Sequence, residues 1–420
     1  MRPDPWPAPT APGPVDALIA LPGSKSMTAR ALVLAAHADQ PSRLHGALAA
    51  RDTRLMAAGL QALGCSVDIA AETWTVEPHG SAAELRHVDC GLAGTVMRFL
   101  PPVAALVPGI TSFDGDEHAR LRPLAPLLDA LEQLGVPIES ASGHLPIQVH
   151  GAAELSGGRV EMDARASSQF VTALLLTGSR CTNGLRLEVG AGVPSRPHID
   201  MTVSMMRQAG LSVHDGDDYW QVDPGRPRGG DVLIEPDLSN AAPFLAAALV
   251  TGGSVTVPNW PETTDQPGDD LQRILTALGA NVSWQDGALR VSGGDGIRGA
   301  DLDLGHAGEL APVIAALTAL ADSPSTLTGL AHLRGHETDR LAALVAEIRR
   351  LGGVAEELPD GLRVEPRPLS ATVVETYDDH RMAQFAAVIG LSVPGVVLSD
   401  VATTAKTLPE FPQMWQALLS

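Results

Sequence analysis

Apolar runs typical of buried helices recur about every seventy residues along this chain, and each begins with a short polar motif. One residue from each motif serves as a marker: Ser26, Thr95, Ser167, Ser239, Glu309 and Arg381. The steps between these markers are 69, 72, 72, 70 and 72 residues. A period this regular indicates an internal repeat of six units.

A glycine that follows an amphipathic helix-like stretch repeats with a similar period. It stands at Gly64, Gly135, Gly210, Gly279 and Gly352, in steps of 71, 75, 69 and 73 residues. Glycine is typical of the position just after a helix, because it adopts a positive φ without steric cost. A sixth copy would fall at the end of the chain, after a last helix-like stretch from Pro412 to Leu419.

Each unit predicts the same order of elements: a strand, an apolar helix, a second strand, a charged loop, an amphipathic helix and two short strands. The chain is therefore expected to be an α/β protein. The first helix of each unit, for example over 30–36, 244–250 or 310–321, is apolar nearly all round and should be buried. The polar motifs then lie at helix starts, where unpaired N–H groups and the helix dipole favour anions.

Length and charge limit the class of protein. One unit buries too little surface to be stable alone, so two domains of three units each fit the 420 residues. The 29 Lys and Arg face 49 Asp and Glu, and the net charge of −20 argues against nucleic acid or an anionic membrane as partner. A phosphorylated substrate is not excluded, because exposed charges are screened beyond roughly 8 Å at physiological salt.

Cysteine use and the lack of targeting signals predict a cytoplasmic location. Cys65, Cys90 and Cys181 lie far apart without the spacing of metal ligands, which favours reduced thiols. The proline-rich start up to Pro14 lacks the apolar core of a signal peptide. No apolar run reaches the ~18 residues needed to span a bilayer.

The first motif, Gly23-Ser24-Lys25-Ser26, contains the lysine of a phosphate-binding loop. A Walker A motif also needs a glycine six positions before its lysine, where this chain has Ile19. The motif is therefore not an ATPase signature. Two interpretations of Lys25 remain: it holds a phosphate or carboxylate, or it is a solvated lysine at a capped helix start.

The other motifs also have two interpretations. Ser167, Ser168 and Gln169 offer two hydroxyls and an amide to a ligand, or they cap a helix. Small residues around Gly94 let a ligand approach the backbone, or they form a tight turn. Charged loops recur in register with the repeat, which favours a shared anion site over solvated loops. These loops contain Arg120, Arg122, Ser195, Arg340 and Lys406.

Six motifs in a fixed order point to a known family. They have the forms PGSKS from Pro22, AGTVMR from Ala93, SSQF from Ser167, ETDR from Glu337, DHRMA from Asp379 and KTLPEF from Lys406. In them the chain resembles the 5-enolpyruvylshikimate-3-phosphate synthase family over essentially its full length. The resemblance implies two similar domains, each of three βαβαββ repeats with buried parallel helices. The domains would be residues 1–22 with 232–420, and residues 23–231, with the active site in the cleft between them.

The activity that this resemblance implies is transfer of the carboxyvinyl group of phosphoenolpyruvate to the 5-hydroxyl of shikimate 3-phosphate, with release of phosphate. It belongs to the pathway to chorismate and the aromatic amino acids, and it needs no metal or organic cofactor. The site must supply cations for two phosphates and two carboxylates, a base for the hydroxyl and an acid for the methylene carbon. We expect a monomer.

Matching the family's motifs residue by residue gives three sets. The phosphoenolpyruvate set is Lys25, Gly94, Arg122, Gln169, Arg340, Arg381 and Lys406. The shikimate 3-phosphate set is Lys25, Ser26, Arg30, Ser167, Ser168, Gln169, Ser195, Glu309 and His336. The catalytic set is Lys25, Glu309, Glu337 and Lys406; Glu309 is the candidate base for the hydroxyl and Glu337 the proton donor and acceptor at the methylene.

Several residues depart from the family's usual pattern. Glu309 replaces an aspartate, His336 a lysine, and His332 and Leu92 each an asparagine. Ala29 lacks the asparagine amide usually found before the arginine matched by Arg30, which keeps open a paralogue that acts on another phosphorylated cyclitol.

Two further alternatives differ from the family's main activity. The UDP-N-acetylglucosamine carboxyvinyltransferases share the fold, but they carry a reactive cysteine in the loop that matches 114–123, and this chain has none there. A binding protein without activity would keep the scaffold, but the retained lysines, arginines and Glu337 argue against it.

Overall fold

A computed structural model describes residues 4–70, 73–78, 82–190, 192–335 and 338–420. The chain divides into two compact units. Unit 1 comprises Met1–Pro22 and Glu235–Ser420, and unit 2 comprises Gly23–Ile234. Each unit has its own hydrophobic core, so each fits a domain that buries its own apolar surface.

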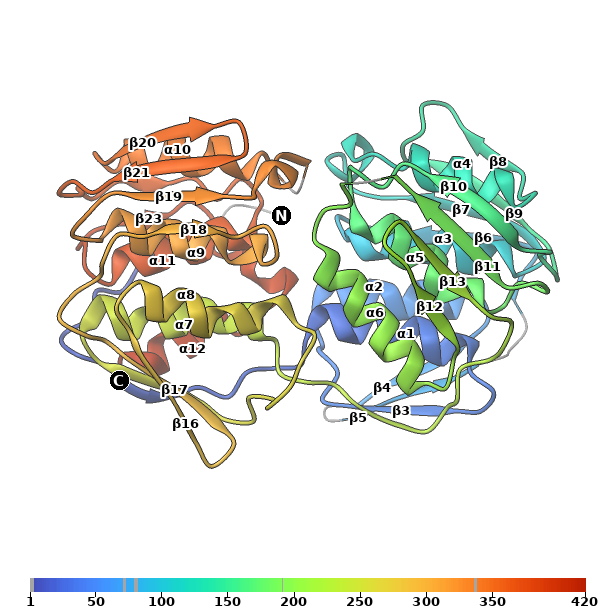
Figure 1. The fold of residues 1–420 in the computed structure, drawn as a ribbon, viewed down its shortest axis with the longest axis horizontal. Coiled ribbons are helices and arrows are strands. Elements are labelled where there is room, and N and C mark those ends of the chain that lie inside the picture. Colours follow the sequence, from blue (N-terminus) through green and yellow to red (C-terminus); the bar gives the residue numbers. More distant parts are fainter. Residues whose placement is uncertain (1–3, 71–72, 79–81, 191, 336–337) are drawn as a thin grey trace. The chain divides into compact units, whose positions relative to one another are not determined.

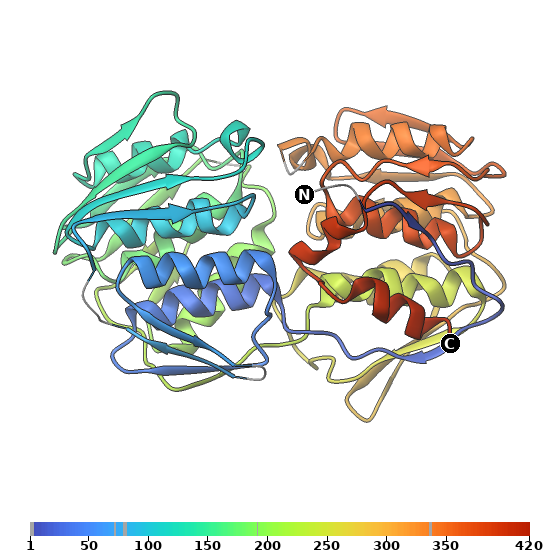
Figure 2. The same ribbon diagram turned by 180° about the vertical axis from the view of Figure 1, so that it is seen from behind.

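Helices that are buried on nearly all sides form the centre of each unit. In unit 2 they are α1 (Lys25–His37), α3 (Gly94–Ala105) and α5 (Ser168–Gly178). In unit 1 they are α7 (Leu238–Thr251), α9 (Ala311–Ala319) and α11 (His380–Gly390). Within each unit these helices lie side by side in the interior, and the sheets lie outside them (Figures 1 and 2). The prediction of buried apolar helices is confirmed.

The polar motifs begin these helices, because their side chains satisfy N–H groups of the first turn. The Ser24 hydroxyl accepts from the Met27 amide at 3.4 Å, and the Asp379 carboxylate accepts from the Arg381 amide at 2.8 Å. Such caps are worth about 1 kcal/mol each. The helices consequently start several residues before the apolar stretches 30–36 and 244–250, within the polar motifs themselves. The stretch predicted over 310–321 divides into the 3₁₀ turn η3 (Gly308–Leu310) and α9.

Amphipathic helices and 3₁₀ turns follow the second strand of the repeats. The helices are α2 (Arg51–Ala62), α4 (Ala125–Gln133), α6 (Arg196–Gln208), α8 (Leu271–Ala277), α10 (Arg340–Arg350) and α12 (Phe411–Leu418). The turns are η1 (Ala119–Leu121), η2 (Pro267–Asp270), η4 (Ala331–Gly335) and η5 (Ala402–Lys406).

Four-stranded sheets of one repeated topology cover the buried helices. In the sheet of β6 (Leu85–Asp89), β7 (Gly109–Asp114), β9 (Ile147–Gly151) and β8 (Ile138–Ser140), β6 pairs parallel with β7, and β9 pairs antiparallel with both β7 and β8. The same order holds for β10 (Gly158–Met162), β11 (Leu185–Val189), β13 (Tyr219–Val222) and β12 (Val213–Asp215). It also holds for β18 (Asp301–Asp303), β19 (Ser325–Thr328), β21 (Gly361–Glu365) and β20 (Val354–Leu358). Each of these three stretches of chain is therefore a βαβαββ repeat.

Two of the repeats take their first strand from a distant part of the chain. The strand β14 (Asp231–Leu233) pairs parallel with β3 (Ser42–His45), which also pairs with β5 (Thr73–Glu77), and β4 (Ser66–Ile69) completes that sheet. The strand β2 (Asp16–Leu18) pairs parallel with β15 (Ser254–Val257), next to β17 (Ala288–Ser292) and β16 (Asn281–Gln285). Because β14 belongs to a sheet of unit 2, that unit extends to Ile234 rather than to Asp231.

The last repeat is completed by the start of the chain. The strands β22 (Val373–Val374) and β23 (Val397–Leu398) pair parallel, and β1 (Trp6–Pro7) pairs antiparallel with β23 in place of a hairpin. The rings of Phe411 and Trp415 in α12 lie 5.2 Å apart, and both contact Phe244 of α7. Burial of these rings holds the last helix on the core, since each aromatic side chain removes a large apolar area from water.

Candidate active site

The first helix of unit 2 places Lys25 and Arg30 on neighbouring turns. Lys25 Nζ lies 3.4 Å from the carboxylate of Asp52, a buried residue in the first turn of α2. The guanidinium of Arg30 is buried and donates to the Thr202 hydroxyl at 2.8 Å, and to the carbonyls of Ser26 and His198 at 2.9 Å. These contacts fix Arg30 between α1 and α6, and the half-buried Ser26 lies one turn before it.

Gln169 lies in the first turn of α5 and is held from two sides. Its backbone N–H donates to the Ser167 hydroxyl at 3.2 Å, and its side-chain oxygen accepts from Arg98 Nη1 of α3 at 2.7 Å. The guanidinium of Arg98 also stacks 5.3 Å from the ring centre of Phe170. Arg98 thereby ties the start of α5, with Ser167 and the buried Ser168, to α3.

Gly94 opens α3 directly beside Arg122. A Cβ atom built on Gly94 would lie 2.9 Å from Arg122 Nη2, so the glycine leaves room for the guanidinium. Arg122 is buried and donates from Nη1 to the Leu92 carbonyl at 3.3 Å, while its Nε has no hydrogen-bond partner among the described residues. A buried guanidinium with donors to spare is suited to an anionic ligand.

Ser195 precedes α6 and adopts a left-handed conformation with φ 52°. Its side chain accepts no cap hydrogen bond from the described helix. The hydroxyl is therefore not committed to capping, and the backbone of this turn, through the His198 carbonyl, contacts Arg30.

Two arginines of unit 1 share one buried carboxylate. Arg340 begins α10 and donates to Asp379 through Nε at 2.7 Å and Nη2 at 3.2 Å, with side-chain exposures of 2% and 0%. Asp379 also caps α11 by accepting from the Arg381 amide. Arg381 Nη1 donates to the Ser239 carbonyl at 2.9 Å and to Gln384 Oε1 at 3.1 Å. The starts of α7, α10 and α11 are thus joined by charged groups.

Glu309 and Lys406 complete the cluster in unit 1. Burial lowers the pKa of Arg381, and the negative charges of Asp237, Glu309 and Asp379 oppose that effect. Glu309 therefore acts electrostatically on Arg381 from the half-buried turn η3. Lys406 is buried at the end of η5, next to Thr407, whose carbonyl accepts from Asn240 Nδ2 at 3.3 Å. Asn240 Oδ1 in turn accepts from Gln384 at 3.2 Å.

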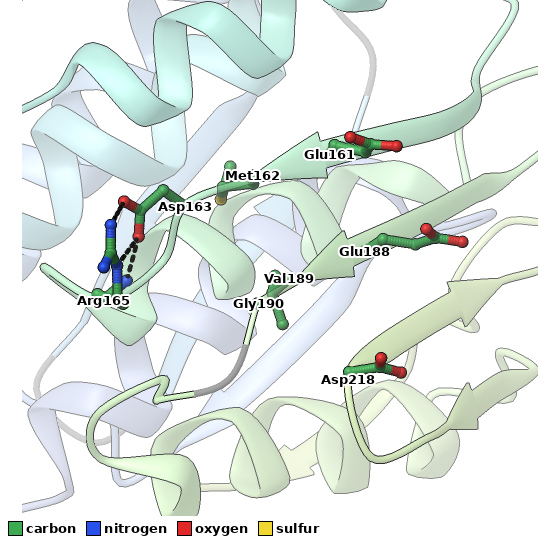
Figure 3. A pocket seen from close by; sticks show the side chains of 8 residues that line it. All are labelled: Glu161, Met162, Asp163, Arg165, Glu188, Val189, Gly190 and Asp218. Carbon is green, nitrogen blue, oxygen red and sulfur yellow. Dashed lines mark hydrogen bonds and ion pairs between the residues drawn. The ribbon is translucent and has the colours of Figure 1, made fainter.

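A groove of about 720 Å³ in unit 2 has none of the predicted site residues among the lining residues that the structure describes (Figure 3). It follows the ends of β10 and β11 and is lined by four carboxylates, those of Glu161, Asp163, Glu188 and Asp218. Arg165 is the one cation among the described lining residues, and Asp163 already binds it at 2.6 Å. Since like charges repel, this groove is unsuited to phosphates and carboxylates.

The described part of the chain has no clustered metal ligands, and its three cysteines are free thiols. No three His, Cys, Asp or Glu side chains are grouped there to hold a metal ion, and no helix there is long and apolar enough to cross a membrane. Burial raises the pKa of Cys65 and of Cys181 to about 11, and it also raises the pKa of Cys90. These thiols therefore stay protonated near neutral pH, which disfavours a nucleophilic role.

Sequence comparison identifies the family. The profile of EPSP synthase (3-phosphoshikimate 1-carboxyvinyltransferase) matches residues 9–415. The chain belongs to the EPSP synthase family. Two relatives named 3-phosphoshikimate 1-carboxyvinyltransferase are 51% identical, from Kocuria rhizophila, and 52% identical, from Mycobacterium ulcerans. Each alignment covers 99% of this chain, with 97% and 98% of the respective relative.

Solved structures of EPSP synthase from Acinetobacter baumannii share the fold. One superposes with a TM-score of 0.82 and another with 0.79, each at 22% sequence identity over 98% of this chain and 97% of theirs. The predicted fold class, two domains of repeated βαβαββ units in the EPSP synthase family, is confirmed at this level.

Several residues that bind members of the predicted sets were not given a role from the sequence. Arg98 and Asp379 lie within the quoted motifs and Asp52 lies outside them, and each binds a residue of the predicted sets. The sequence shows these charged side chains, but it does not show their partners, because each partner lies far away along the chain. Two predicted residues, His336 and Glu337, lie outside the described residues.

Proposed function

We propose that this member of the EPSP synthase family transfers the carboxyvinyl group of phosphoenolpyruvate to the 5-hydroxyl of shikimate 3-phosphate. The observation that carries the proposal is the family match over residues 9–415, with relatives of that activity above 50% identity along the whole chain. The buried cations support it, because a chain with net charge −20 keeps lysines and arginines at the starts of its buried helices. Such positions favour phosphates and carboxylates.

The reaction makes and breaks few bonds. The 5-oxygen of shikimate 3-phosphate attacks C2 of phosphoenolpyruvate while its proton passes to a base, and C3 gains a proton to become a methyl group. Loss of phosphate from C2 and of a proton from C3 then restores the double bond. In our proposal Glu309 takes the hydroxyl proton, Glu337 gives and removes the C3 proton, and Lys25 and Lys406 stabilise the charge that develops on the phosphate.

Phosphoenolpyruvate is assigned to cations of both units. Lys25, Gly94, Arg122 and Gln169 lie in unit 2, and Arg340, Arg381 and Lys406 lie in unit 1. Guanidinium groups bind carboxylate and phosphate with two N–H groups at once, which favours arginine for this task. We propose that the two sets meet in a cleft between the units.

Shikimate 3-phosphate is assigned mainly to unit 2. Hydroxyl and cationic groups at the starts of α1, α5 and α6 would bind its phosphate and carboxylate, and Glu309 and His336 would reach its hydroxyls. The residues are Lys25, Ser26, Arg30, Ser167, Ser168, Gln169 and Ser195. In this arrangement the enzyme works as a cytoplasmic monomer without a cofactor.

One assay tests the reaction directly. The purified protein is incubated with phosphoenolpyruvate and shikimate 3-phosphate while phosphate release and the vinyl protons of the product are followed by NMR. We expect stoichiometric phosphate and carboxyvinyl ether, and loss of both in Lys25→Met. Wild-type protein that forms neither product would contradict the proposal. If turnover occurs only with another phosphorylated cyclitol, or only with UDP-N-acetylglucosamine, that compound and not shikimate 3-phosphate is the acceptor.

A further inference from the structure

The segment that presents Asp379 and Arg381 has an unusual backbone. Tyr377 and Asp378, the two residues before Asp379, both have a φ of 54°. Residues with a Cβ atom rarely adopt this left-handed region, and two in succession need support from the surrounding structure. Asp379 carries both Arg340 and the amide of Arg381, so the turn decides where two buried guanidinium groups point.

A buried carboxylate supports this turn. Glu347 in α10 has a side-chain exposure of 0% and accepts from the Tyr377 hydroxyl at 2.7 Å. It also accepts from the Glu375 amide at 3.1 Å, and its charge is matched by Arg350 Nε at 3.1 Å. The strained turn is therefore bonded to α10 at its start and in its middle.

Arg340 and Glu347 lie on the same face of α10. They are seven residues apart, which is close to two helical turns. Arg340 binds Asp379, and Glu347 binds Tyr377 and the Glu375 backbone. One face of α10 thus binds the 375–379 segment at three residues: Glu375 before the pair with positive φ, Tyr377 within it and Asp379 after it.

We propose that Glu347 and Tyr377 are positioning residues that hold the strained turn and so aim Arg340 and Arg381 at phosphoenolpyruvate. The proposal rests on the proposed function, since that function assigns both arginines to this substrate. Neither residue touches substrate in our account, and both act through Asp379.

The chemistry of the contact suits a permanent support. Burial, and the neighbouring Glu347 carboxylate, raise the pKa of Tyr377 to about 12. The phenol therefore keeps its proton at neutral pH and remains a donor to Glu347. A hydrogen bond to a charged acceptor is stronger than one between neutral groups, and it offsets part of the backbone strain.

Tyr377→Phe is the primary test, because it removes one hydroxyl and keeps the ring. We expect KM for phosphoenolpyruvate to rise roughly tenfold, the size of effect that follows from loss of a hydrogen bond to a charged group. The KM for shikimate 3-phosphate should change much less. The matched control is Tyr219→Phe in β13 of unit 2, which removes a phenol hydroxyl elsewhere and should leave both KM values unchanged.

A second substitution tests the role of strain. Glycine adopts positive φ freely, so Asp378→Gly in the Tyr377→Phe background should restore much of the lost phosphoenolpyruvate affinity. A role for Tyr377 in stability alone would not give this rescue. A double variant with the same KM as Tyr377→Phe would count against the proposed aiming of the arginines.

Hydrogen exchange supplies a readout that does not depend on activity. The amide of Arg381 is bonded to Asp379, so exchange in a peptide covering residues 375–382 should be faster in Tyr377→Phe than in wild type. Tyr219→Phe should show wild-type exchange. Unchanged exchange together with unchanged KM values would overturn the positioning role. If the wild-type enzyme is inactive but exchange is still faster in Tyr377→Phe than in wild type, the proposed function is overturned instead.

Discussion

At the scale of single residues, the cations in this protein are distinguished by their burial rather than by their number. The chain has an excess of acidic residues, yet Arg30, Arg122, Arg340 and Arg381 are buried. A buried charge is costly unless it is paired or hydrogen-bonded. Arg340 is fully paired with Asp379, whereas Arg122 and Arg381 each keep a buried Nε that has no hydrogen-bond partner among the described residues. Donors of this kind are available to an anionic ligand.

The carboxylate of Glu309 gives the first prediction. Glu309→Gln keeps the size of the side chain but removes the base, so kcat should fall by about 10²- to 10⁴-fold. The KM values should change little, because the cations that bind the substrates remain. Steady-state kinetics with both substrates measure this. Glu262→Gln, at an exposed glutamate of the same unit, is the control. A Glu309→Gln enzyme with wild-type kcat would remove Glu309 from the mechanism.

At the scale of elements, the site is built from the starts of buried helices. The cap residues Ser24, Ser167, Asp237 and Asp379 belong to the polar motifs and begin the helices, so the same side chains shape the fold and the site. Asp379 has the largest share, because it caps α11 and binds the first residue of α10.

Removing the charge of Asp379 should therefore destabilise unit 1. Asp379→Asn removes the negative charge that binds the buried guanidinium of Arg340, and breaking a buried ion pair in this way costs roughly 3 to 5 kcal/mol. Urea unfolding followed by circular dichroism gives the free energy of unfolding. Glu365→Gln, which removes a half-exposed partner of Arg367 in the same unit, should leave the unfolding midpoint nearly unchanged. Equal midpoints for both variants would argue against a structural role for the Arg340–Asp379 pair.

The start of α3 gives a steric prediction. A methyl group at Gly94 would lie 2.9 Å and 3.0 Å from the two terminal nitrogens of Arg122, so Gly94→Ala must displace that guanidinium. We expect KM for phosphoenolpyruvate to rise roughly tenfold, which corresponds to about 1.4 kcal/mol. Gly13→Ala is the control, because a Cβ atom there meets nothing within 4 Å. Unchanged kinetics for Gly94→Ala would exclude Arg122 from the phosphoenolpyruvate site.

At the scale of the whole molecule, the chain is divided into two units that each carry part of the proposed site. Unit 2 contributes Lys25 and Arg122, and unit 1 contributes Arg340 and Lys406. Like charges repel one another unless an anion lies between them. A ligand with several negative charges should therefore favour a conformation in which the two sets of cations come together.

Small-angle X-ray scattering tests this proposal. Addition of shikimate 3-phosphate with phosphoenolpyruvate should lower the radius of gyration of the wild-type protein. Lys25→Met, which lacks a cation assigned to both substrates, should show little change under the same conditions. A radius of gyration that stays the same in wild type, at concentrations shown to saturate the enzyme, would contradict closure around the ligands.

The sequence alone determined the repeat, the buried helices and the polar motifs at their starts. These properties are local, because apolar periodicity and capping depend on residues within a few positions of one another. The family motifs also gave the fold class and the candidate sets. The helix starts show the limit of this local signal, since the exact first residue depended on caps such as Ser24 and Asp237.

The tertiary structure decided everything that joins distant positions. The pairing of β14 with β3 joins the two ends of unit 2, and the pairing of β2 with β15 joins the two chain segments of unit 1. No local pattern specifies which sheet a short strand enters. The bonds of Lys25 to Asp52 and of Arg340 to Asp379 depend on three-dimensional neighbours. So does the positive φ of Tyr377 and Asp378, which local preference disfavours and which Glu347 supports from another helix.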